Sequence, residues 1–474
     1  MKFTQLSLSD IYDNCKDLSE NDKPAFLSLL ETYLDISEYI PLSFYKHFYK
    51  NFGRKRKYQL ESFLYALLIQ RIFSIPTDSL LITFLKFSKE LREFCGFTKV
   101  PDASKFTTFK QNFSDDLSQL FERLVDITEP ICQCIDSTLA STLVFDTSGV
   151  EAYVTENNPK FMSLLIKQLK HFYKNNPSVD PYKMAYGLMP SHASSNPSVK
   201  QLYINGHFCY VYKFGLLTNG LGIVRNISFF DDQYLTNHPD IMIDKKSDSP
   251  DEDKSLSDSK ALKPVINDFL SAHPFIKPET FLGDSAFDTI ASYSFLLSDC
   301  HFSKAVIPLN PRSSTDLPEP GFDESGQPLC PKDASLPMKY EGKAPLRSGV
   351  VRYKWVCPKI KWKGNKRVCL CDFPCTPASS GRMVYTYPEK NLRLYPGIIR
   401  DTPEWISTYK QRSVIEQTIN HFKENMCVAN RKTQNSATIK ADLLLAGIAQ
   451  LITVILADKI HEHKLIRSLK PLLA

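Results

Sequence analysis

Four residues near the C-terminus have the types and spacing that chemistry on a phosphate backbone requires. Residues 409–423 read YKQRSVIEQTINHFK and contain Tyr409, Arg412, Glu416 and Lys423. On a single helix, at about 100° per residue, Tyr409 and Lys423 lie about 20° from Glu416 around the axis, and Arg412 lies about 40° away. A carboxylate flanked by cations suits a metal ion bound beside a phosphate. An exposed helix with salt bridges at helical spacing is the alternative.

Two aspartates far from this string stand on predicted strands. Asp146 follows an apolar run, and Asp284 ends a later strand. An acid in a buried strand is costly unless it is paired, hydrogen-bonded or bound to a cation. If the two aspartates converge with Glu416, three carboxylates can hold two Mg²⁺ ions for phosphodiester chemistry. Asp146 could instead stand in a turn, Asp284 could cap a helix, and Asp136 and Asp288 are rival positions.

The order of predicted elements indicates a mixed α/β fold. Helical apolar periodicity dominates until the sequence becomes β-rich at Leu143. Three antiparallel strands follow, with Asn219-Gly220 as a hairpin turn and a polar insertion at about 156–200. Then come a helix, a strand, a helix and a strand, a Pro-, Gly- and Cys-rich stretch, and two final helices. We expect a helical N-terminal domain at 1–140, the first part of a core at 141–310, a β-rich basic insertion at 311–400 and the C-terminal part of the core at 401–474.

Two clusters of basic residues interleaved with aromatic residues indicate binding of nucleic acid. The formal net charge of +6 is too mild to indicate it alone. Residues 339–367 contain ten Lys or Arg and a single acid. Residues 44–58 contain a run of four consecutive basic residues. A solvated basic surface is the alternative for both clusters. The candidate DNA contacts in the second cluster are Arg54, Lys55, Arg56 and Lys57.

Twelve cysteines occur in a chain whose N-terminus has no apolar segment typical of a secretory signal. They indicate reduced thiols or metal ligands rather than disulfides. Five of them lie within 46 residues, where a small subdomain with a thin core would benefit from a structural Zn²⁺. The candidate ligands are Cys330, Cys357, Cys371 and Cys375, with Cys369 close by. No C-x2-C pair occurs among them, so the spacing favours reduced structural cysteines over zinc.

The longest apolar run, residues 443–457, is too short to cross a membrane. It covers about 15 residues and contains Gln450 and Thr453, whereas a bilayer needs roughly 20 apolar residues. We therefore expect a buried C-terminal helix and no membrane partner. With no secretory signal visible, we expect a cytoplasmic, nucleoid-associated protein.

Taken together, these residues resemble the DDE transposases of bacterial insertion sequences. The string Y-x2-R-x3-E-x6-K is similar to the signature of the insertion sequence four-like group, and all four positions match. Asp146 within VFDTSG resembles the family's first aspartate, and Asp284 within GDSAFDT resembles its second. The resemblance implies a ribonuclease H-like core in which Asp146, Asp284 and Glu416 are catalytic and hold two Mg²⁺ (or Mn²⁺) ions.

The same resemblance implies contacts with double-stranded DNA. Tyr409, Arg412 and Lys423 would contact the backbone near the scissile phosphate. The string LREFCGFTKVPDASKFTTFKQNF is similar to a helical domain that precedes the core in many such transposases. The 311–400 insertion stands where they carry a β-rich insertion that touches DNA ends. Its candidate contacts are Arg352, Lys354, Trp355, Lys361 and Trp362, although the two tryptophans could instead pack a small core.

The implied function is metal-dependent cleavage of DNA at transposon terminal inverted repeats, followed by strand transfer into target DNA. A homodimer would pair the two ends. One alternative is a ribonuclease H-like nuclease that cuts without joining, which an assay of 3′-end joining separates. Another is a cleavage-dead descendant that only binds DNA, and the presence of all three carboxylates argues against it.

Overall fold

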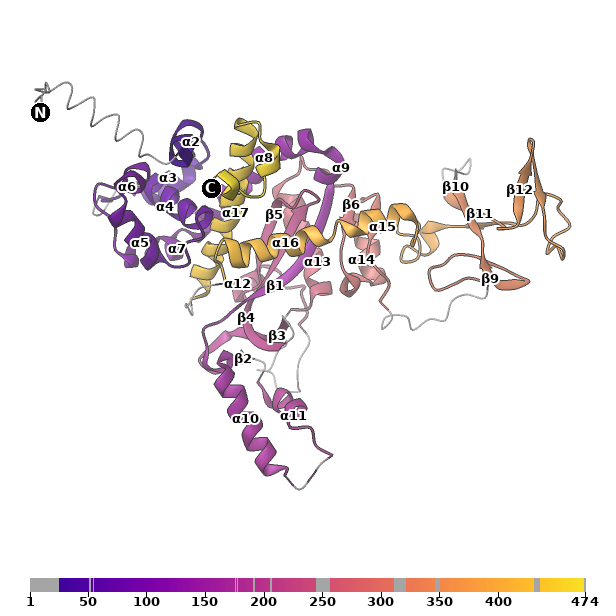
Figure 1. Ribbon diagram of the computed structural model, residues 1–474, viewed down its shortest axis with the longest axis horizontal. Helices are drawn as coiled ribbons and strands as arrows, with labels where there is room; N and C mark the ends of the chain where they lie inside the picture. Colours follow the sequence, from indigo (N-terminus) through magenta and orange to yellow (C-terminus); the bar gives the residue numbers. More distant parts are fainter. Residues whose placement is uncertain are drawn as a thin grey trace, which may run out of the picture.

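The computed structural model describes residues 25–472, apart from 51–52, 54, 175, 177, 191, 205–206, 244–255, 311–320, 346–349 and 430–434. Figure 1 shows a central sheet with helices packed around it and a helical region that contains the first described residues. A two-helix arm projects from the sheet, and a β-rich region stands at the far end. This is a mixed α/β fold, as the sequence predicts.

The N-terminal region is helical, as predicted. The apolar stretch from Leu60 is interrupted at Ile75-Pro76, where proline lacks the backbone N–H that a helix interior needs. The buried side chains of these helices belong to the same hydrophobic core as the sheet, so the region does not fold around a core of its own. The helices are α2 (Ala25–Tyr33), α3 (Leu42–Phe48), α4 (Leu60–Ile72), α5 (Asp78–Phe87), α6 (Lys89–Phe94), α7 (Ala103–Asn112), α8 (Ser114–Ile135) and α9 (Ser137–Ala140).

Seven strands form the central sheet in the order β2-β3-β4-β1-β6-β7, with β5 also paired to β4. β1 is antiparallel to β4 and parallel to β6, and β6 is parallel to β7. β1 and β6 are therefore neighbours, which is the condition for their aspartates to converge. The strands are β1 (Thr142–Glu151), β2 (His192–Ala193), β3 (Asn196–Ile204), β4 (His207–Asn219), β5 (Val224–Phe229), β6 (Thr280–Leu282) and β7 (Lys304–Val306).

Helices cover both faces of this sheet. Successive side chains of a strand point to opposite faces: on β5, Asn226 donates to the Val265 carbonyl of α13 at 3.5 Å, whereas Arg225 points toward α8. α16 lies across β1 and β4 (Figure 1), and α17 packs on β5, α4, α7 and α8. The helices are α12 (Asp232–Asn237), α13 (Asp258–Ala272), α14 (Ile290–Ser294), α15 (Pro403–Lys410), α16 (Ser413–Asn420) and α17 (Ser436–Lys459).

α17 joins the N-terminal helices to the sheet. Among the described residues it alone is long and apolar enough to cross a membrane, which corrects the expectation that its apolar run is too short, yet 94% of its most apolar window is buried inside the molecule. This confirms the predicted buried C-terminal helix. Its Asp442 pairs with Arg71 of α4 and, at 2.9 Å, with Lys110 of α7. The buried charges are thus matched across three helices.

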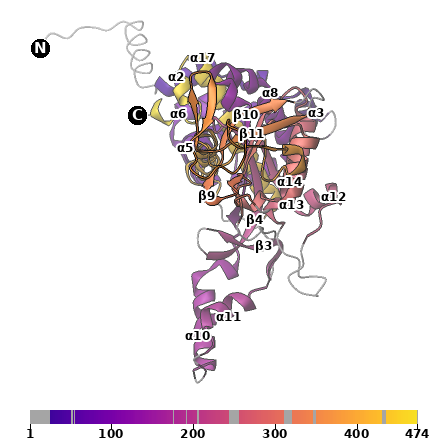
Figure 2. The same ribbon diagram turned by 90° about the vertical axis from the view of Figure 1, so that its right-hand side faces the viewer.

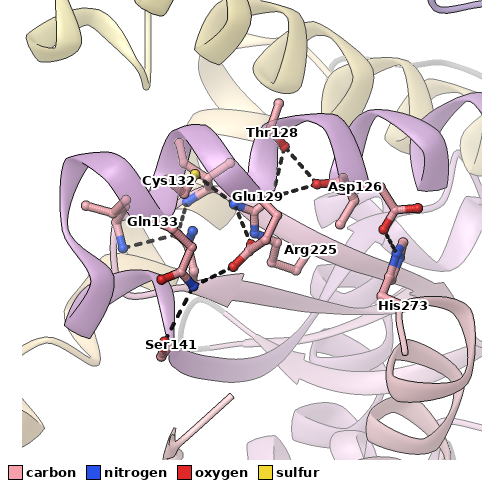
Figure 3. Close-up of polar contacts among 12 residues, drawn as sticks. Asp126, Thr128, Glu129, Cys132, Gln133, Ser141, Arg225 and His273 are labelled. Atoms are coloured by element: carbon pink, nitrogen blue, oxygen red, sulfur yellow. Dashed lines mark hydrogen bonds and ion pairs between the residues drawn. The ribbon is translucent and has the colours of Figure 1, made fainter. Parts of the chain in front are cut away.

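A second buried cation holds α8 against the sheet (Figure 3). Arg225 of β5 donates to Thr128 Oγ1 at 2.9 Å, and its guanidinium lies 3.3 Å from the Glu129 carboxylate. On the same helix, Asp126 lies 2.7 Å from His273, the residue that follows α13. A buried guanidinium without such partners would be costly, so these contacts fix the position of α8 on β5.

Two helices form the arm between β1 and β3. α10 (Pro159–Phe172) and α11 (Pro181–Leu188) project away from the sheet in both views (Figures 1 and 2). The arm corresponds to the polar insertion predicted at about 156–200. It leaves β1 continuous from Thr142 to Glu151, so the strand that carries Asp146 is not displaced.

The insertion consists of three small sheets, β8-β9, β10-β11-β14 and β12-β13. It stands apart from the central sheet, beyond α15 (Figure 1). A separate hydrophobic cluster of Met338, Tyr353, Trp355 and Tyr395 packs it. The strands are β8 (Leu329–Cys330), β9 (Asp333–Pro337), β10 (Lys339–Pro345), β11 (Val351–Val356), β12 (Ile360–Lys363), β13 (Lys366–Cys369) and β14 (Met383–Thr386).

Candidate active site and nucleic-acid-binding residues

Three carboxylates converge on the guanidinium of Arg412. Its Nη2 lies 3.2 Å from Asp146 Oδ2 and 3.9 Å from Asp284 Oδ2. Its Nη1 donates to Glu416 Oε1 at 2.6 Å. The fold therefore brings together the three acids that were singled out in distant parts of the sequence.

Each acid is held by a different element. Asp146 lies in the middle of β1, where the adjacent Phe145 points to the opposite face of the sheet and is buried. Asp284 lies two residues after the end of β6 and caps a short helix, because the Ala286 N–H donates to its Oδ1 at 2.8 Å. Glu416 is exposed on α16. Because β1 and β6 are parallel neighbours and α16 crosses β1, the three positions meet.

Burial governs the charges of this site. Burial raises the pKa of Asp146 to about 6, with Arg412 lowering it and Asp284 raising it further. Burial also raises the pKa of Asp284. Burial opposes the charge of Arg412, but attraction from Asp146 and Glu416 outweighs it and raises the pKa of Arg412. One guanidinium thus faces three carboxylates in a partly desolvated place, so the negative charge is incompletely balanced.

The four-residue string does not lie on one helix, which corrects the prediction. α15 ends before Arg412, a turn separates it from α16, and a π-helical turn (His421–Asn425) follows α16. Arg412 and Glu416 keep their i,i+4 spacing and form a salt bridge, which is the contact described by the alternative of an exposed helix with salt bridges at helical spacing. The other two residues take different positions because the helical phase changes at the turn and at the π-helical segment.

Tyr409 lies beside the acids. Its ring stacks on Trp405, with centroids 5.1 Å apart and planes 18° apart. Burial raises the pKa of Tyr409, while Arg412 lowers it and Asp284 raises it. The phenol therefore interacts electrostatically with both Arg412 and Asp284.

Lys423 lies farther along the sheet. Burial lowers the pKa of Lys423, and the charges with which it interacts include Cys209 of β4 and Glu151 at the end of β1. A strand rises about 3.3 Å per residue, which places Glu151 about 16 Å beyond Asp146. Lys423 therefore extends the site along β1 rather than completing the acid cluster.

A fourth carboxylate, Asp258, borders the site and was missed in the sequence. It begins α13, lies 2.7 Å from Lys213 Nζ and accepts a hydrogen bond from the Thr147 hydroxyl. The charge of Asp258 also raises the pKa of Asp146 and of Asp284, although burial has the larger effect on both. Its surroundings in the sequence are charged and serine-rich and suggest a linker. The one signal was its place at the start of an amphipathic helix.

The rival aspartates have structural partners instead. Asp288 is buried, pairs with Arg393 at 2.6 Å and accepts the Tyr293 hydroxyl at 2.9 Å. Asp136 caps α9, because the Leu139 N–H donates to its side chain at 2.9 Å. Neither lies among the groups that contact Arg412.

The donor set of the site fits a hard divalent cation. Three carboxylates supply the oxygen ligands that Mg²⁺ and Mn²⁺ prefer. A cation among them would relieve the cost of keeping Asp146 ionised while it is buried. Within the described residues, however, no three His, Cys, Asp or Glu side chains are placed to hold one metal ion. Arg412 lies between the acids, so metal binding requires this side chain to move aside.

The two tryptophans predicted to contact DNA differ in accessibility. Trp362 of β12 is 62% exposed, with the Arg367 guanidinium 4.7 Å from its ring centroid, and the adjacent Lys361 is exposed. Trp355 is 1% exposed and donates to Thr386 Oγ1 at 2.9 Å. Trp355 packs the small core, which corrects its assignment as a DNA contact in favour of the core alternative.

The basic residues of the insertion are partly engaged within it. The Arg352 guanidinium lies 3.9 Å from the ring centroid of Tyr385. Glu341 pairs with Lys354 at 2.8 Å and with Arg367 at 2.6 Å. One acid therefore offsets two cations of the basic cluster at 339–367, of which Lys354 is a candidate DNA contact.

The N-terminal basic run is only partly described. Lys55 and Lys57 are exposed. Arg56 donates to the Phe48 carbonyl at 3.1 Å, and its guanidinium lies 4.9 Å from the centroid of that ring. Arg54 lies outside the described residues. Lys55 and Lys57 thus present their charges to solvent, with Lys57 Nζ 5.6 Å from the Tyr58 ring centroid. Arg56 is exposed too, but it also supports the helical region.

The cysteines predicted as zinc ligands gather in the insertion. Cys330, Cys357, Cys371 and Cys375 line one pocket together with Cys369. All five are free thiols.

Comparison with known proteins connects the N-terminal region with transposases. A family model described as "Transposase domain (DUF772)" matches residues 14–112, which is 99 of the 474 residues. No curated protein matches the chain. Among solved structures, the chain is similar to the "Cryo-EM structure of piggyBac transposase synaptic complex with hairpin DNA (SNHP)", with 10% identity over 95% of this chain and 79% of that chain and a TM-score of 0.37. That likeness is too weak to support a conclusion, whereas the family-model match supports a relationship of the N-terminal helices to transposases.

Proposed function

We propose that this protein is a DDE transposase that cleaves DNA at transposon ends and joins the freed ends to target DNA. The observation that carries the proposal is the convergence of Asp146, Asp284 and Glu416 around Arg412. These acids come from β1, from the end of β6 and from α16, so the fold has collected them from separate elements. The transposase-domain match at residues 14–112 supports the same conclusion independently.

The sheet supports a ribonuclease H-like core for this activity. Its centre consists of three antiparallel strands, β5, β4 and β1, followed by the parallel strands β6 and β7. The first aspartate, Asp146, lies on β1, and the second, Asp284, lies just after β6, the parallel neighbour of β1. Glu416 lies on α16, which packs across β1 and β4. This placement is the one that the resemblance to DDE transposases implies.

The three acids would hold two Mg²⁺ or Mn²⁺ ions, which when bound activate water and stabilise the leaving oxygen of a phosphodiester. The protein's own groups do the remaining work. In the absence of DNA, Arg412 offsets part of the negative charge of the three acids. With DNA bound, its guanidinium can turn to a phosphate oxygen, which it contacts in bidentate fashion. Tyr409 can donate from beside the acids, and Lys423 can hold a phosphate farther along β1.

The partner would be double-stranded DNA, both at terminal inverted repeats and at the target. The exposed Lys361 and Trp362 of the insertion and the exposed Lys55 and Lys57 of the N-terminal region supply separate basic surfaces for it. A homodimer would pair the two ends. The activity would take place in the cytoplasm, at the nucleoid.

A cleavage and joining assay tests the proposal. The substrate is DNA that flanks the reading frame in its native element, incubated with the full chain, Mg²⁺ and a target plasmid. Glu416→Gln should lower strand cleavage by about 100- to 1,000-fold because a charged ligand is lost, with binding of the end DNA retained. Glu424→Gln is the matched control, since Glu424 is exposed two turns farther along. It should cleave at the wild-type rate.

The outcomes separate the proposal from its alternatives. Cleavage with 3′-end joining supports the transposase. Cleavage without joining would replace it with a nuclease, and binding without cleavage by the wild type would indicate a cleavage-dead DNA-binding protein. Wild-type cleavage by the Glu416→Gln variant would refute the assignment of the site.

A further inference from the structure

Five cysteines of the insertion surround one pocket. The pocket has a volume of about 220 Å³ and is lined by Cys330, Cys357, Cys369, Cys371 and Cys375. These residues come from the end of β8, from the residue after β11, from the end of β13 and from the loop that follows it. Four backbone segments therefore bring a thiol to the same place, which chance placement of incidental cysteines does not explain.

Hydrogen bonds to backbone carbonyls hold these segments together around the pocket. The Leu370 N–H donates to the Lys359 carbonyl at 3.1 Å and joins the segment after β11 to the end of β13. Lys332 Nζ donates to the Pro374 carbonyl at 3.1 Å and joins the β8-β9 turn to the loop that carries Cys375. The pocket is therefore a meeting point of the β8-β9 and β12-β13 hairpins.

Strand pairing and hydrogen bonds place four of the five thiols near one another. Cys369 lies opposite Ile360 in the β12-β13 pair, and the Ile360 N–H donates to the Cys357 carbonyl at 3.1 Å. Cys330 and Cys375 flank the contact of Lys332 with the Pro374 carbonyl. Cys371 differs, because its Sγ donates to the Phe373 carbonyl within its own loop at 3.4 Å.

The charges that line the pocket suit a thiolate-bound cation. Four thiolates around Zn²⁺ carry a net negative charge. Lys332, Lys359 and Arg382 also line the pocket and can offset it, with Asp333 as the opposing charge.

The two hairpins need a fastening that the apolar core does not provide. The small core of Met338, Tyr353, Trp355 and Tyr395 packs β10, β11 and the loop after β14. None of its members lies on β8, β9, β12 or β13. An isolated two-stranded hairpin is marginally stable in water, and small units of this kind gain stability from a structural metal ion.

We propose that Cys330, Cys357, Cys369 and Cys375 bind one structural Zn²⁺ that fastens the β8-β9 and β12-β13 hairpins. This replaces Cys371 by Cys369 in the ligand set expected from the sequence. Zn–S bonds of about 2.3 Å require the thiols to close in, because within the described residues no three of them are placed to hold one ion. The bound insertion is therefore tighter than the metal-free one.

Metal analysis of the full chain tests this proposal. The protein is purified under reducing conditions without added metal, and its zinc content is measured by mass spectrometry of the elements. We expect close to one zinc per chain. Cys369→Ser should lose it, whereas Cys371→Ser, two residues away, should retain it. Asp284→Asn should also retain it, which separates this site from the acids.

Cobalt provides a second measurement on the unaltered chain, in case Cys369→Ser does not fold. Replacing zinc by Co²⁺ should give thiolate-to-cobalt charge-transfer absorption and the intense visible bands of tetrahedral Co²⁺. Absence of zinc together with absence of these bands would overturn the proposal. So would equal loss of zinc from Cys369→Ser and Cys371→Ser, or loss of zinc from Asp284→Asn.

Discussion

The acid site and the insertion place their functional side chains by opposite means. Asp146 stands on β1 and Asp284 just after its paired strand β6, within one continuous hydrophobic core that extends from the N-terminal helices to α17. The cysteines stand on short hairpins beside a core of four residues. In the first region the backbone fixes the ligands. In the second, we infer, the ligands fix the backbone.

This difference has a physical consequence for each site. A rigid frame can hold groups in unfavourable electrostatic surroundings, and the raised pKa of the buried Asp146 is the sign of such a cost. The insertion has a core of only four buried residues among those described, which cannot hold groups in unfavourable surroundings, so binding of a metal ion by its cysteines must add to its stability. Removing the charge of a buried acid should therefore stabilise the protein, whereas removing a buried side chain from the small core of the insertion should destabilise it.

The largest expected effect is at Trp355. Trp355→Ala should destabilise the insertion by about 3–5 kcal/mol, because it removes the largest member of a four-residue core and a hydrogen bond to Thr386. Hydrogen exchange of the β10, β11 and β14 amides measures this. Trp362→Ala, on the exposed tryptophan, should leave exchange unchanged. Equal protection in both variants would contradict the thin-core account.

The second effect has the opposite sign. The pKa of Asp146 lies at about 6 in the folded protein against an ordinary 3.8, so the folded state binds this proton more tightly than the unfolded chain. The resulting stability is present below pH 3.8 and is lost as the pH rises through 6. Asp146→Asn should therefore stabilise the protein by up to about 3 kcal/mol at pH 7.5. The gain should vanish near pH 3.

Urea denaturation at pH 7.5 and at low pH measures this change, with the exposed Asp299→Asn as the matched control. A loss of stability at pH 7.5 would show that burial of Asp146 is not costly. The comparison between the two regions would then fail.

A third effect concerns the cation among the acids. Arg412→Gln should lower the stability of the metal-free protein by about 2 kcal/mol, less than for a fully buried pair because the site is partly exposed. Millimolar Mg²⁺ should raise the melting temperature of this variant more than that of the wild type, since the ion replaces the lost charge. Thermal unfolding with and without Mg²⁺ tests this, with Lys410→Gln as control. If Mg²⁺ raised the melting temperature of Arg412→Gln and of the wild type equally, Arg412 would not compete with the metal ion for the acids.

The smallest effect is at Glu341, which offsets Lys354 and Arg367 in the insertion. Glu341→Gln should raise the affinity for non-specific duplex DNA about two- to threefold at low salt and little at high salt. Fluorescence anisotropy at two salt concentrations measures it. Glu389→Gln, also exposed in the insertion, should change less. Weaker binding by Glu341→Gln would mean that this surface does not face DNA.

The elements of the core could be read from the sequence because local patterns dictate them. Short β-rich, apolar runs located β1 and β6, and the longest apolar run located α17. The break between α15 and α16 and the π-helical turn at His421 could not be read, because the residues are compatible with one helix and tertiary packing decides. Asp258 was missed for a similar reason: a charged, serine-rich segment gives no sign that its last part folds back on β1.

The cysteine pocket shows the same limit. The spacing of the cysteines in the sequence singles out the region but not the ligands, because nothing in the sequence distinguishes Cys369 from Cys371, which is two residues away. Only strand pairing, which places Cys369 opposite Ile360, and the contact of Cys371 with Phe373 distinguish them. Burial likewise separates Trp355 from Trp362, which the sequence treats alike.

Iron-directed cleavage of the polypeptide tests the central claim most directly. Fe²⁺ that replaces Mg²⁺ at the acids, with ascorbate and peroxide, generates radicals that cut the backbone near the ion. We predict three cuts, near Asp146, Asp284 and Glu416, all suppressed by excess Mg²⁺ and all absent in Asp284→Asn. Cuts near a single one of these residues, or cuts that survive in Asp284→Asn, would contradict a shared site.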